Sequence, residues 1–211
     1  MKKEIDVRNW KRKNTADFFI EDEEPHFSIT SPIDVTNLYR FSKENRLSFY
    51  YCLIYLSMKS INSIDEFHYK FEGDRVYYYD YLQPSFCDLK KGETEYYIVD
   101  VRMDSDESIK SFNTKCIEKS FNQKTFIDEK GFEVNELVYI SCLPWMDVTS
   151  ISEERKFDKN DSIPHICWGK YVENNGRLVL HYQIMVNHRL MDGYHVGLFF
   201  NRLQDLINKL Q

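Results

Sequence analysis

The segment "RLVLHYQIMVNHRLMDGYHVGLFFNRLQDL", residues 177–206, contains a strand, a turn and a helix in direct succession. Its first part is apolar and β-branched as far as Asn187, and the polar, glycine-containing "HRLMDG" of 188–193 follows. These features predict a strand that runs into a turn. From His195 to Leu210, apolar residues recur on one helical face: Val196, Phe199, Phe200, Leu203, Leu206 and Ile207. We therefore expect a helix that docks against a sheet.

The residues upstream predict antiparallel strands and three further helices. Residues 162–187 form a hairpin turning at Asn175-Gly176, and 67–81 form a second one around Gly73-Asp74. Additional strands are predicted at 94–103 and at 136–145, where Pro144 ends the strand. The helices are predicted from Asp34 or Thr36 to Asn45, from the cap Ser48 to Ile61, and from the cap Ser105 to Gln123.

Long strands joined by hairpins, with helices towards both chain ends, indicate an α+β fold. We expect two layers, in which helices cover one face of a large, mostly antiparallel mixed sheet. No internal repeat, low-complexity tract or Gly/Ser linker interrupts the sequence. A chain of 211 residues is also long enough for one good-sized core. The prediction is a single domain over residues 1–211.

The composition is globular and acidic, with 42% hydrophobic residues and a net charge of −6. A nucleic-acid partner is not expected, because the basic run at 8–13 is short and acidic residues follow at 21–24. The N-terminus has no apolar core of a signal peptide, and the apolar run 49–58 is too short to span a membrane. Five scattered cysteines without a CxxC pair favour reduced thiols and a cytoplasmic location.

Residue patterns alone leave the chemistry open. The sequence has no Walker, GxGxxG, HExxH or GxSxG motif, and we expect no bound metal. His188 directly follows a predicted strand, so a rigid element can hold its ring, and imidazole is a base that works near neutral pH. The alternative is that His188 only satisfies a turn or packs at an interface. The residues by themselves do not decide between the two.

Three segments together resemble the chloramphenicol acetyltransferase family. "NHRLMDGYHVGLFFNRLQDL" (187–206) is similar to the family's HHxxxDG signature and the helix after it. "DVRNWKRKNTADFF" (6–19) resembles its opening Trp-x-Arg segment, and "YISCLPWMDVTS" (139–150) its Ser-x-Leu-Pro-Trp segment. Their order and spacing fit the family along essentially the whole chain. Condensation domains and the acyltransferase cores of 2-oxo-acid dehydrogenase complexes share HHxxxDG, but the short chain without a carrier-domain attachment favours the stand-alone trimeric type.

The resemblance implies a role for each matching residue. His188 corresponds to the base that takes the proton of the substrate hydroxyl as its oxygen attacks the thioester of acetyl-CoA. Ser141 corresponds to the hydroxyl that stabilises the resulting oxyanion. Arg12 and Asp192 match the buried ion pair that holds the histidine-bearing turn. The remaining matches are Phe18, Phe19, Tyr96 and Cys167 for substrate binding, and Lys170 and Tyr171 for cofactor binding.

Three departures from the family pattern concern the turn and the acceptor pocket. Asn187 replaces the first histidine of the doublet, which is not the base in the family. Cys167 replaces a threonine that orders a water molecule, and a thiol is a weaker hydrogen-bond donor. Glu153 and Arg155 fall where the family places apolar residues that meet the antibiotic. Either these charges point away from the pocket, or the acceptor is a different alcohol.

The predicted function is an acetyl-CoA-dependent O-acetyltransferase acting on chloramphenicol or a similar small hydroxyl compound through a ternary complex, without a metal. The resemblance implies a homotrimer with active sites at subunit interfaces, and we expect no nucleic-acid or membrane partner. Two alternatives remain. One is a family member that is catalytically weak and binds or acetylates a different hydroxyl compound. The other is a soluble α+β protein with no enzyme function.

Overall fold

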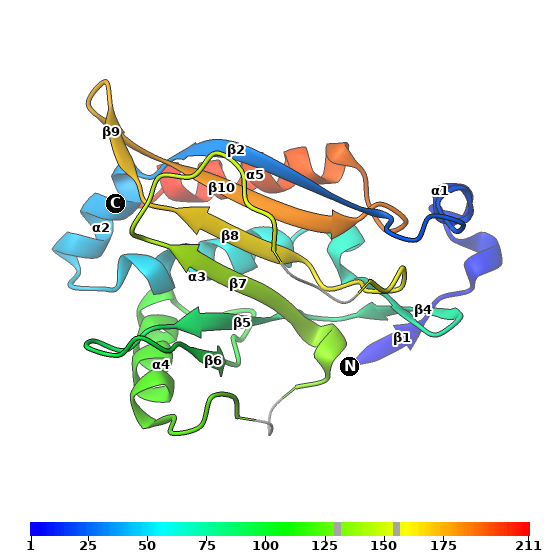
Figure 1. The fold of residues 1–211 in the computed structure, drawn as a ribbon, viewed down its shortest axis with the longest axis horizontal. Helices are drawn as coiled ribbons and strands as arrows, with labels where there is room; N and C mark the ends of the chain where they lie inside the picture. Colours follow the sequence, from blue (N-terminus) through cyan, green and yellow to red (C-terminus); the bar gives the residue numbers. More distant parts are fainter. Residues whose placement is uncertain (129–131, 154–156) are drawn as a thin grey trace.

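The computed structural model describes residues 1–128, 132–153 and 157–211. In these residues the main sheet has seven strands, in the order β2-β10-β8-β7-β5-β6 with β9 paired to β10. Figure 1 shows them as one twisted layer. The strands are β2 (His26–Asp34), β5 (Gln83–Asp88), β6 (Tyr97–Asp100), β7 (Leu137–Leu143), β8 (His165–Gly169), β9 (Val172–Asn174) and β10 (Arg177–Asn187).

Both strand orientations occur in this sheet. Strand β10 is antiparallel to β2, β8 and β9, and β5 is antiparallel to β6. Strand β7 is parallel to both β5 and β8. Parallel neighbours need a long crossover, and the one between β5 and β7 contains α4 (Ile109–Asn122). The predicted mixed, mostly antiparallel sheet is confirmed.

Helices cover one face of the sheet, which confirms the predicted two-layer α+β fold (Figure 1). They are α2 (Thr36–Glu44), α3 (Phe49–Ile61) and α5 (Gly193–Asn208). On α5 the buried residues recur every three or four positions, as Val196, Phe199, Leu203 and Ile207 do. Tyr182 of β10 joins the layers, because its ring stacks on Trp168 of β8 at 5.4 Å and contacts Phe199 of α5 at 5.7 Å.

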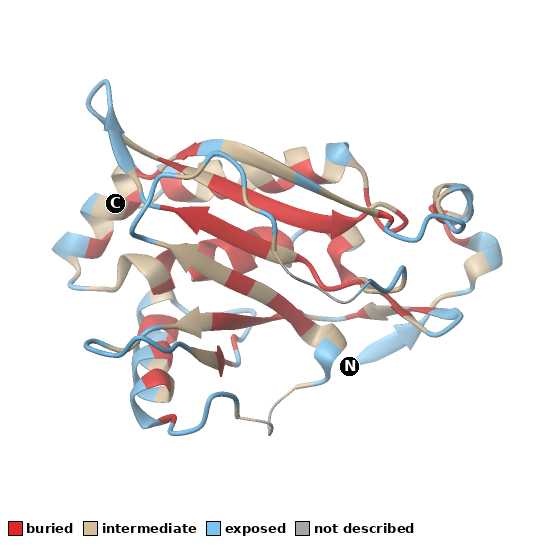
Figure 2. Cartoon of the chain, viewed as in Figure 1, coloured by how far each residue is buried: buried red, intermediate tan, exposed pale blue. Residues whose placement is uncertain are grey.

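The core lies between these two layers. Figure 2 shows buried residues along the central strands and the helices behind them, and exposed residues at the β9 hairpin and β1. Helix α3 is buried on most sides, as its apolar sequence predicts, and the Ser48 hydroxyl accepts a hydrogen bond from Tyr51 N. No helix of the described residues is both long and apolar enough to cross a membrane.

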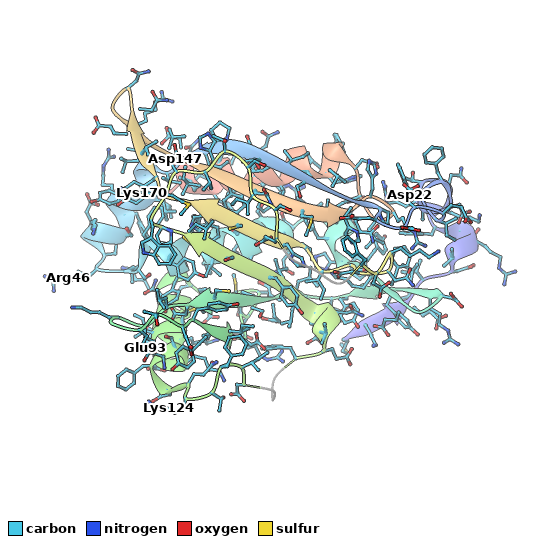
Figure 3. All side chains as sticks on the ribbon, viewed as in Figure 1. Asp22, Arg46, Glu93, Lys124, Asp147 and Lys170 are labelled. Atoms are coloured by element: carbon cyan, nitrogen blue, oxygen red, sulfur yellow. The ribbon has the colours of Figure 1, made fainter. Side chains whose placement is uncertain are left out.

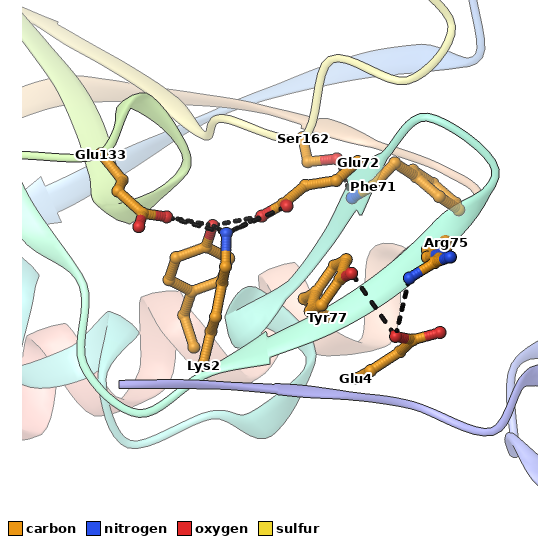
Figure 4. Close-up of polar contacts among 9 residues, drawn as sticks. Lys2, Glu4, Phe71, Glu72, Arg75, Tyr77, Glu133 and Ser162 are labelled. Atoms are coloured by element: carbon orange, nitrogen blue, oxygen red, sulfur yellow. Dashed lines mark hydrogen bonds and ion pairs between the residues drawn. The ribbon is translucent and has the colours of Figure 1, made fainter.

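A second, three-stranded sheet contains the predicted 67–81 hairpin. Its order is β1 (Lys2–Glu4), β4 (Arg75–Tyr79), β3 (Tyr69–Glu72), and Gly73 has the positive φ of 59° that the tight turn requires. Figure 4 shows the Lys2 ammonium between the carboxylates of Glu72 and Glu133, each 2.9 Å away. The short helices are η1 (Val7–Asn9), α1 (Lys13–Phe18), η2 (Asp65–His68) and η3 (Val134–Glu136).

Some predicted boundaries were wrong, and three strands, β1, β2 and β5, were missed. Helix α4 is capped by Ser108 rather than Ser105, because Ser108 has an extended backbone and its hydroxyl accepts from Ser111 N. The strand predicted at 94–103 is limited to β6. Strands β2 and β5 contain Pro32 and Pro84, which hide a strand pattern in the sequence. Pro32 is tolerated because β2 is an edge strand, and Pro84 because it is near the start of β5.

Candidate active site

His188 lies in the turn directly after β10, packed between two aromatic rings. The ring centroids of Phe19 and Phe27 are 4.3 and 4.6 Å from the imidazole. The His188 backbone N–H donates to the carbonyl of Pro25 at 2.6 Å. Its side chain is 34% exposed, while Nδ1 is buried, forms no hydrogen bond with the described residues and lies 3.5 Å from Asp192 Oδ1. The imidazole is therefore held on a rigid element with part of its ring open to solvent.

Arg12 and Asp192 hold this turn from the side of the N-terminal segment. Arg12 Nη1 donates to Asp192 Oδ2 at 2.7 Å, and Nη2 donates to Oδ1 at 2.9 Å and to the His188 carbonyl at 3.3 Å. The hydrogen bonds from Arg12 lower the pKa of the Asp192 carboxyl. Asp192 is also the N-cap of α5, and its backbone N–H donates to His195 Nδ1 at 3.0 Å. The predicted ion pair is present and fixes both ends of the turn.

Asn187, which precedes His188, is buried, and its side chain forms three hydrogen bonds. Its Nδ2 donates to the carbonyls of Lys159 and Asp161 at 2.9 and 2.8 Å. Its Oδ1 accepts from the Arg189 backbone N–H at 3.0 Å. The asparagine therefore ties the end of β10 to the segment before β8.

Ser141 lies on β7 and faces a groove of about 1540 Å³. The groove is lined mainly by residues of β5, β6, β7 and β8 and by residues that precede or follow these strands. Tyr96, Lys170 and Tyr171 also line it, as does the exposed Trp145. Figure 3 labels Lys170 and Asp147 at the end of the molecule opposite Asp22, which follows α1. Tyr171 packs against Tyr39 and Phe49, with centroids 5.5 and 5.4 Å away.

Cys167 lies on β8 directly beside Ser141, in register with it. It is only 2% exposed, and burial, followed by the charge of Glu153, raises the pKa of its thiol to about 12. The thiol is therefore neutral and reaches the groove little. Glu153 lines the same groove, and its Oε2 lies 3.8 Å from Nδ1 of His165. Arg155, the other predicted charge near the pocket, lies outside the described residues.

Ser141 and His188 are far apart within one chain. Cys167 pairs with Ser141 on one side and with Gln183 on the other, so His188 is two strands across and five residues further along β10. These steps correspond to roughly 10 Å across the strands and roughly 17 Å along them. Figure 1 shows that the arrowheads of β7 and β10 point to opposite ends of the sheet. The chain after β10 therefore carries His188 away from the carboxyl end of β7, near which Ser141 lies.

Comparison with known proteins identifies the family. The sequence profile of chloramphenicol acetyltransferase matches residues 2–204. The chain belongs to the chloramphenicol acetyltransferase family. Chloramphenicol acetyltransferase 3 of Escherichia coli is 28% identical over 204 residues, which cover 97% of this chain and 96% of that relative.

Solved structures agree with this family and its CoA-dependent acyltransferase fold. A chloramphenicol acetyltransferase superposes with a TM-score of 0.86 at 26% identity, over 98% of this chain and 100% of that one. The dihydrolipoamide acetyltransferase of Azotobacter vinelandii, with a TM-score of 0.67 and 15% identity, covers 93% of this chain and 86% of its own and shares the fold alone. The protein is therefore an acyltransferase enzyme.

For a member of this family, the structure divides the predicted site residues into two groups. Arg12, Phe19 and Asp192 surround His188, and Phe18 packs on Phe19 but is otherwise exposed. Ser141, Tyr96, Lys170 and Tyr171 line the groove, and Cys167 lies beside Ser141 on the neighbouring strand β8. Sequence reasoning missed His165, although it precedes Cys167 by two positions and so faces the groove from the same strand. Among the described residues no group of three or more His, Cys, Asp or Glu side chains could hold a metal ion.

Proposed function

We infer that the protein transfers the acetyl group of acetyl-CoA to a hydroxyl of chloramphenicol or a similar small alcohol. Family membership supports the reaction class, and the firmly held His188 at the end of β10 is the observation that carries the chemistry. The proposal takes residues 1–211 as one acyltransferase domain without a metal. Both substrates are bound together, so the acetyl group moves directly from the thioester to the alcohol in a ternary complex.

In this mechanism His188 acts as the general base. The Asp192 carboxylate, 3.5 Å from Nδ1, favours the tautomer with the proton on Nδ1. The Nε2 lone pair then accepts the hydroxyl proton while the alcohol oxygen attacks the thioester carbon. Arg12 holds the Asp192 carboxylate and the His188 carbonyl, so the ring does not have to be ordered during the reaction.

Ser141 donates its hydroxyl to the oxyanion of the tetrahedral intermediate. When the intermediate collapses, the C–S bond breaks, the ester is released, and the CoA thiolate takes the proton from His188. Lys170 and Tyr171, at the end of β8, suit the phosphates and the adenine of CoA, because an ammonium pairs with phosphate and an aromatic ring stacks on a base. Phe18, Phe19, Tyr96 and the wall residue Cys167 form the acceptor site.

The separation of Ser141 from His188 supports an active site shared between subunits. A base must come within hydrogen-bond distance of the hydroxyl that attacks beside Ser141, and a single chain keeps the two residues too far apart. If the His188 end of one chain covers the groove of the next, head-to-tail contacts close a ring, which we infer to be a homotrimer. Phe18, 78% exposed beside the His188 turn, and Trp145, 65% exposed at the groove, supply apolar surface for this contact.

Release of CoA thiol tests the reaction, with chloramphenicol and a panel of other alcohols as acceptors. Wild-type protein should release thiol only when an acceptor is present, and His188→Ala should lower kcat at least 100-fold. His181→Ala is the control, since this histidine lies on β10, the strand that leads to His188, and pairs with Asp147 instead. Absence of acceptor-dependent release from wild type rejects the reaction, and a His188→Ala variant with normal kcat rejects the base.

Mixing two inactive variants tests the shared site. Ser141→Ala and His188→Ala chains, unfolded and refolded together, should regain activity, because some interfaces then join an intact groove to an intact histidine. With equal amounts, about a quarter of the interfaces are intact, so about a quarter of the wild-type rate should return. A mixture as inactive as the separate variants contradicts a site between chains.

Glu153 favours a second candidate, acetylation of a hydroxyl compound more polar than chloramphenicol. Its side chain is 18% exposed and lies in the same groove as Ser141, close to His165. A carboxylate in a partly dry pocket favours acceptors that donate hydrogen bonds over purely apolar ones. A kcat/KM for chloramphenicol that rises in Glu153→Leu, while that for polar alcohols in the same panel falls, would support this candidate.

A further inference from the structure

Arg189, the residue after His188, is a buried cation bonded to neutral oxygen atoms. It is 6% exposed, and the centre of its guanidinium lies 4.1 Å from the centroid of the Phe71 ring. Its Nε donates to the Ala16 carbonyl at 3.3 Å, and its Nη1 donates to the Lys159 carbonyl at 3.2 Å and to Asn160 Oδ1 at 2.8 Å. No carboxylate of the described residues forms an ion pair with it.

Such a residue is not explained by stability. Burying a charge without an ion-pair partner is costly, and burial lowers the pKa of the Arg189 guanidinium, an effect that the charge of Asp17 only partly offsets. An apolar side chain of similar length over Phe71 would remove the cost of the buried charge, but it would also take a donor from the Ala16 and Lys159 carbonyls and from Asn160 Oδ1. These two effects oppose each other, so the net contribution of Arg189 to stability is small. The role of Arg189 is therefore to be found in the segments that its hydrogen bonds connect.

They connect both structures that surround His188. Ala16 belongs to α1, which leads directly into Phe19, whose ring packs on the His188 imidazole. Lys159 and Asn160 belong to the segment 158–163, which lines the groove before β8. Arg189 thus connects α1, which leads into the Phe19 that packs on the imidazole, with the segment 158–163, which borders the groove.

Asn187 strengthens this bridge from the other side of His188. Both flanking residues donate to the Lys159 carbonyl, while the His188 ring packs on Phe19 and Phe27. The segment 158–163 is itself fixed, because the Ser162 carbonyl accepts from the buried Lys70 ammonium at 2.8 Å. The direction of the His188 ring is therefore set by its two neighbours, which are bound to a rigid support.

We propose that Arg189 is a positioning residue for the base, which fixes the orientation of the His188 ring through Ala16 and the segment 158–163. The inference rests on the proposed role of His188. Without Arg189 the turn keeps the Arg12 contacts on one side only, and α1 with Phe19 is free to shift. A displacement of about 1 Å at a reacting group costs up to about 100-fold in rate.

The test compares Arg189→Met, Arg189→Lys and the control Arg177→Met, an exposed arginine at the other end of β10. For Arg189→Met we expect a melting temperature close to that of wild type, an unchanged KM for acetyl-CoA and a kcat lowered about 10- to 100-fold. Arg189→Lys, which retains a donor, should recover part of kcat. The control should match wild type in all three measurements. A normal kcat in Arg189→Met, or a loss of activity that only follows unfolding, overturns the proposal.

A second measurement does not depend on turnover. The ring protons of His188, assigned in NMR spectra by their absence from His188→Ala, should carry ring-current shifts from Phe19 and Phe27, which lie within 4.6 Å. In Arg189→Met these shifts should move towards those of an unstructured histidine, and unchanged shifts overturn the proposal. If wild type lacks acceptor-dependent activity, the proposed function fails, whereas this measurement still decides whether Arg189 orients His188.

Discussion

Arg12 and Asp192 are 180 positions apart in the sequence and meet in a two-bonded ion pair with N–O distances of 2.7 and 2.9 Å. The pair joins the N-terminal segment to the N-cap residue of the last helix, and Arg12 also bonds the carbonyl of His188 in the turn before that helix. A planar guanidinium that binds a carboxylate through two bonds also fixes orientation. The turn is therefore held by a contact between the two ends of the chain.

Asp192→Ala should destabilise the fold, because it leaves the Arg12 guanidinium, 9% exposed, without its anion. We expect a loss of about 1–3 kcal/mol, less than for a fully buried pair because water screens the exposed part of Asp192. Urea denaturation measures it. Asp17→Ala, which removes one partner of the exposed Lys13–Asp17 pair, is the control and should change stability by less than about 0.5 kcal/mol. Equal stability of the two variants would contradict the structural role of Asp192.

Asn187→Ala removes two donors and one acceptor from a buried site. The carbonyl oxygens of Lys159 and Asp161 each lose a partner, and we expect a loss of about 1–3 kcal/mol in urea denaturation. Asn187→His should also destabilise, since one imidazole does not supply two donors and an acceptor in this geometry. The exposed Asn174 provides the control, where alanine should cost less than about 0.5 kcal/mol. A fully stable Asn187→His would count against the importance of this network.

Lys70→Met should stabilise the protein near neutral pH. Burial lowers the pKa of the Lys70 ammonium to about 7, and its Nζ bonds only the Ser162 carbonyl among the described residues. Between pH 7 and 10.5 the unfolded chain holds this proton and the folded chain does not, so wild-type stability rises with pH in this window. We therefore expect a gain of about 1–3 kcal/mol for methionine at pH 7, which falls by up to about 1.4 kcal/mol per pH unit and is lost between about pH 8 and pH 10.

Urea denaturation at pH 7, 8, 9 and 10 measures this difference in stability. These pH values cover the range above the lowered Lys70 pKa of about 7. Lys110→Met, at an exposed position of α4, serves as the control, and its difference from wild type should not vary with pH. A Lys70→Met variant that is less stable than wild type at neutral pH would refute the prediction.

Gly169→Ala tests the close packing at the end of β8. A Cβ there would lie 2.8 Å from the Met146 carbonyl oxygen and from Val148 Cγ2, so the segment after β7 must move. We expect a cost of about 1–3 kcal/mol in thermal unfolding. Gly197→Ala, inside α5 with open space around the new methyl, should instead stabilise by about 0.5–1 kcal/mol. A Gly169→Ala variant more stable than wild type would contradict the prediction, because it would show that residues 146–148 move without cost.

Elements governed by neighbouring residues could be predicted from the sequence. Ser48 caps α3, and Asn175-Gly176 turns the last hairpin, with positive φ at both residues. Strands β2 and β5 could not be predicted from the sequence, because each contains a proline and is recognisable only from the strand beside it. Ser105 and Ser108 are equally good caps by type, and only the turn around Asp104 and Glu107 decides between them.

For the site, the sequence by itself determined which residues are present and where the turn lies. Its motifs establish the family and single out His188 and Ser141 as candidates. Only the tertiary structure decided that these two lie two strands apart and five residues apart along the sheet, and that Asn187 and Arg189 are buried supports of the turn. Motifs reflect contacts along a short stretch of chain, whereas strand order and the partners of a buried arginine depend on packing between segments far apart in sequence.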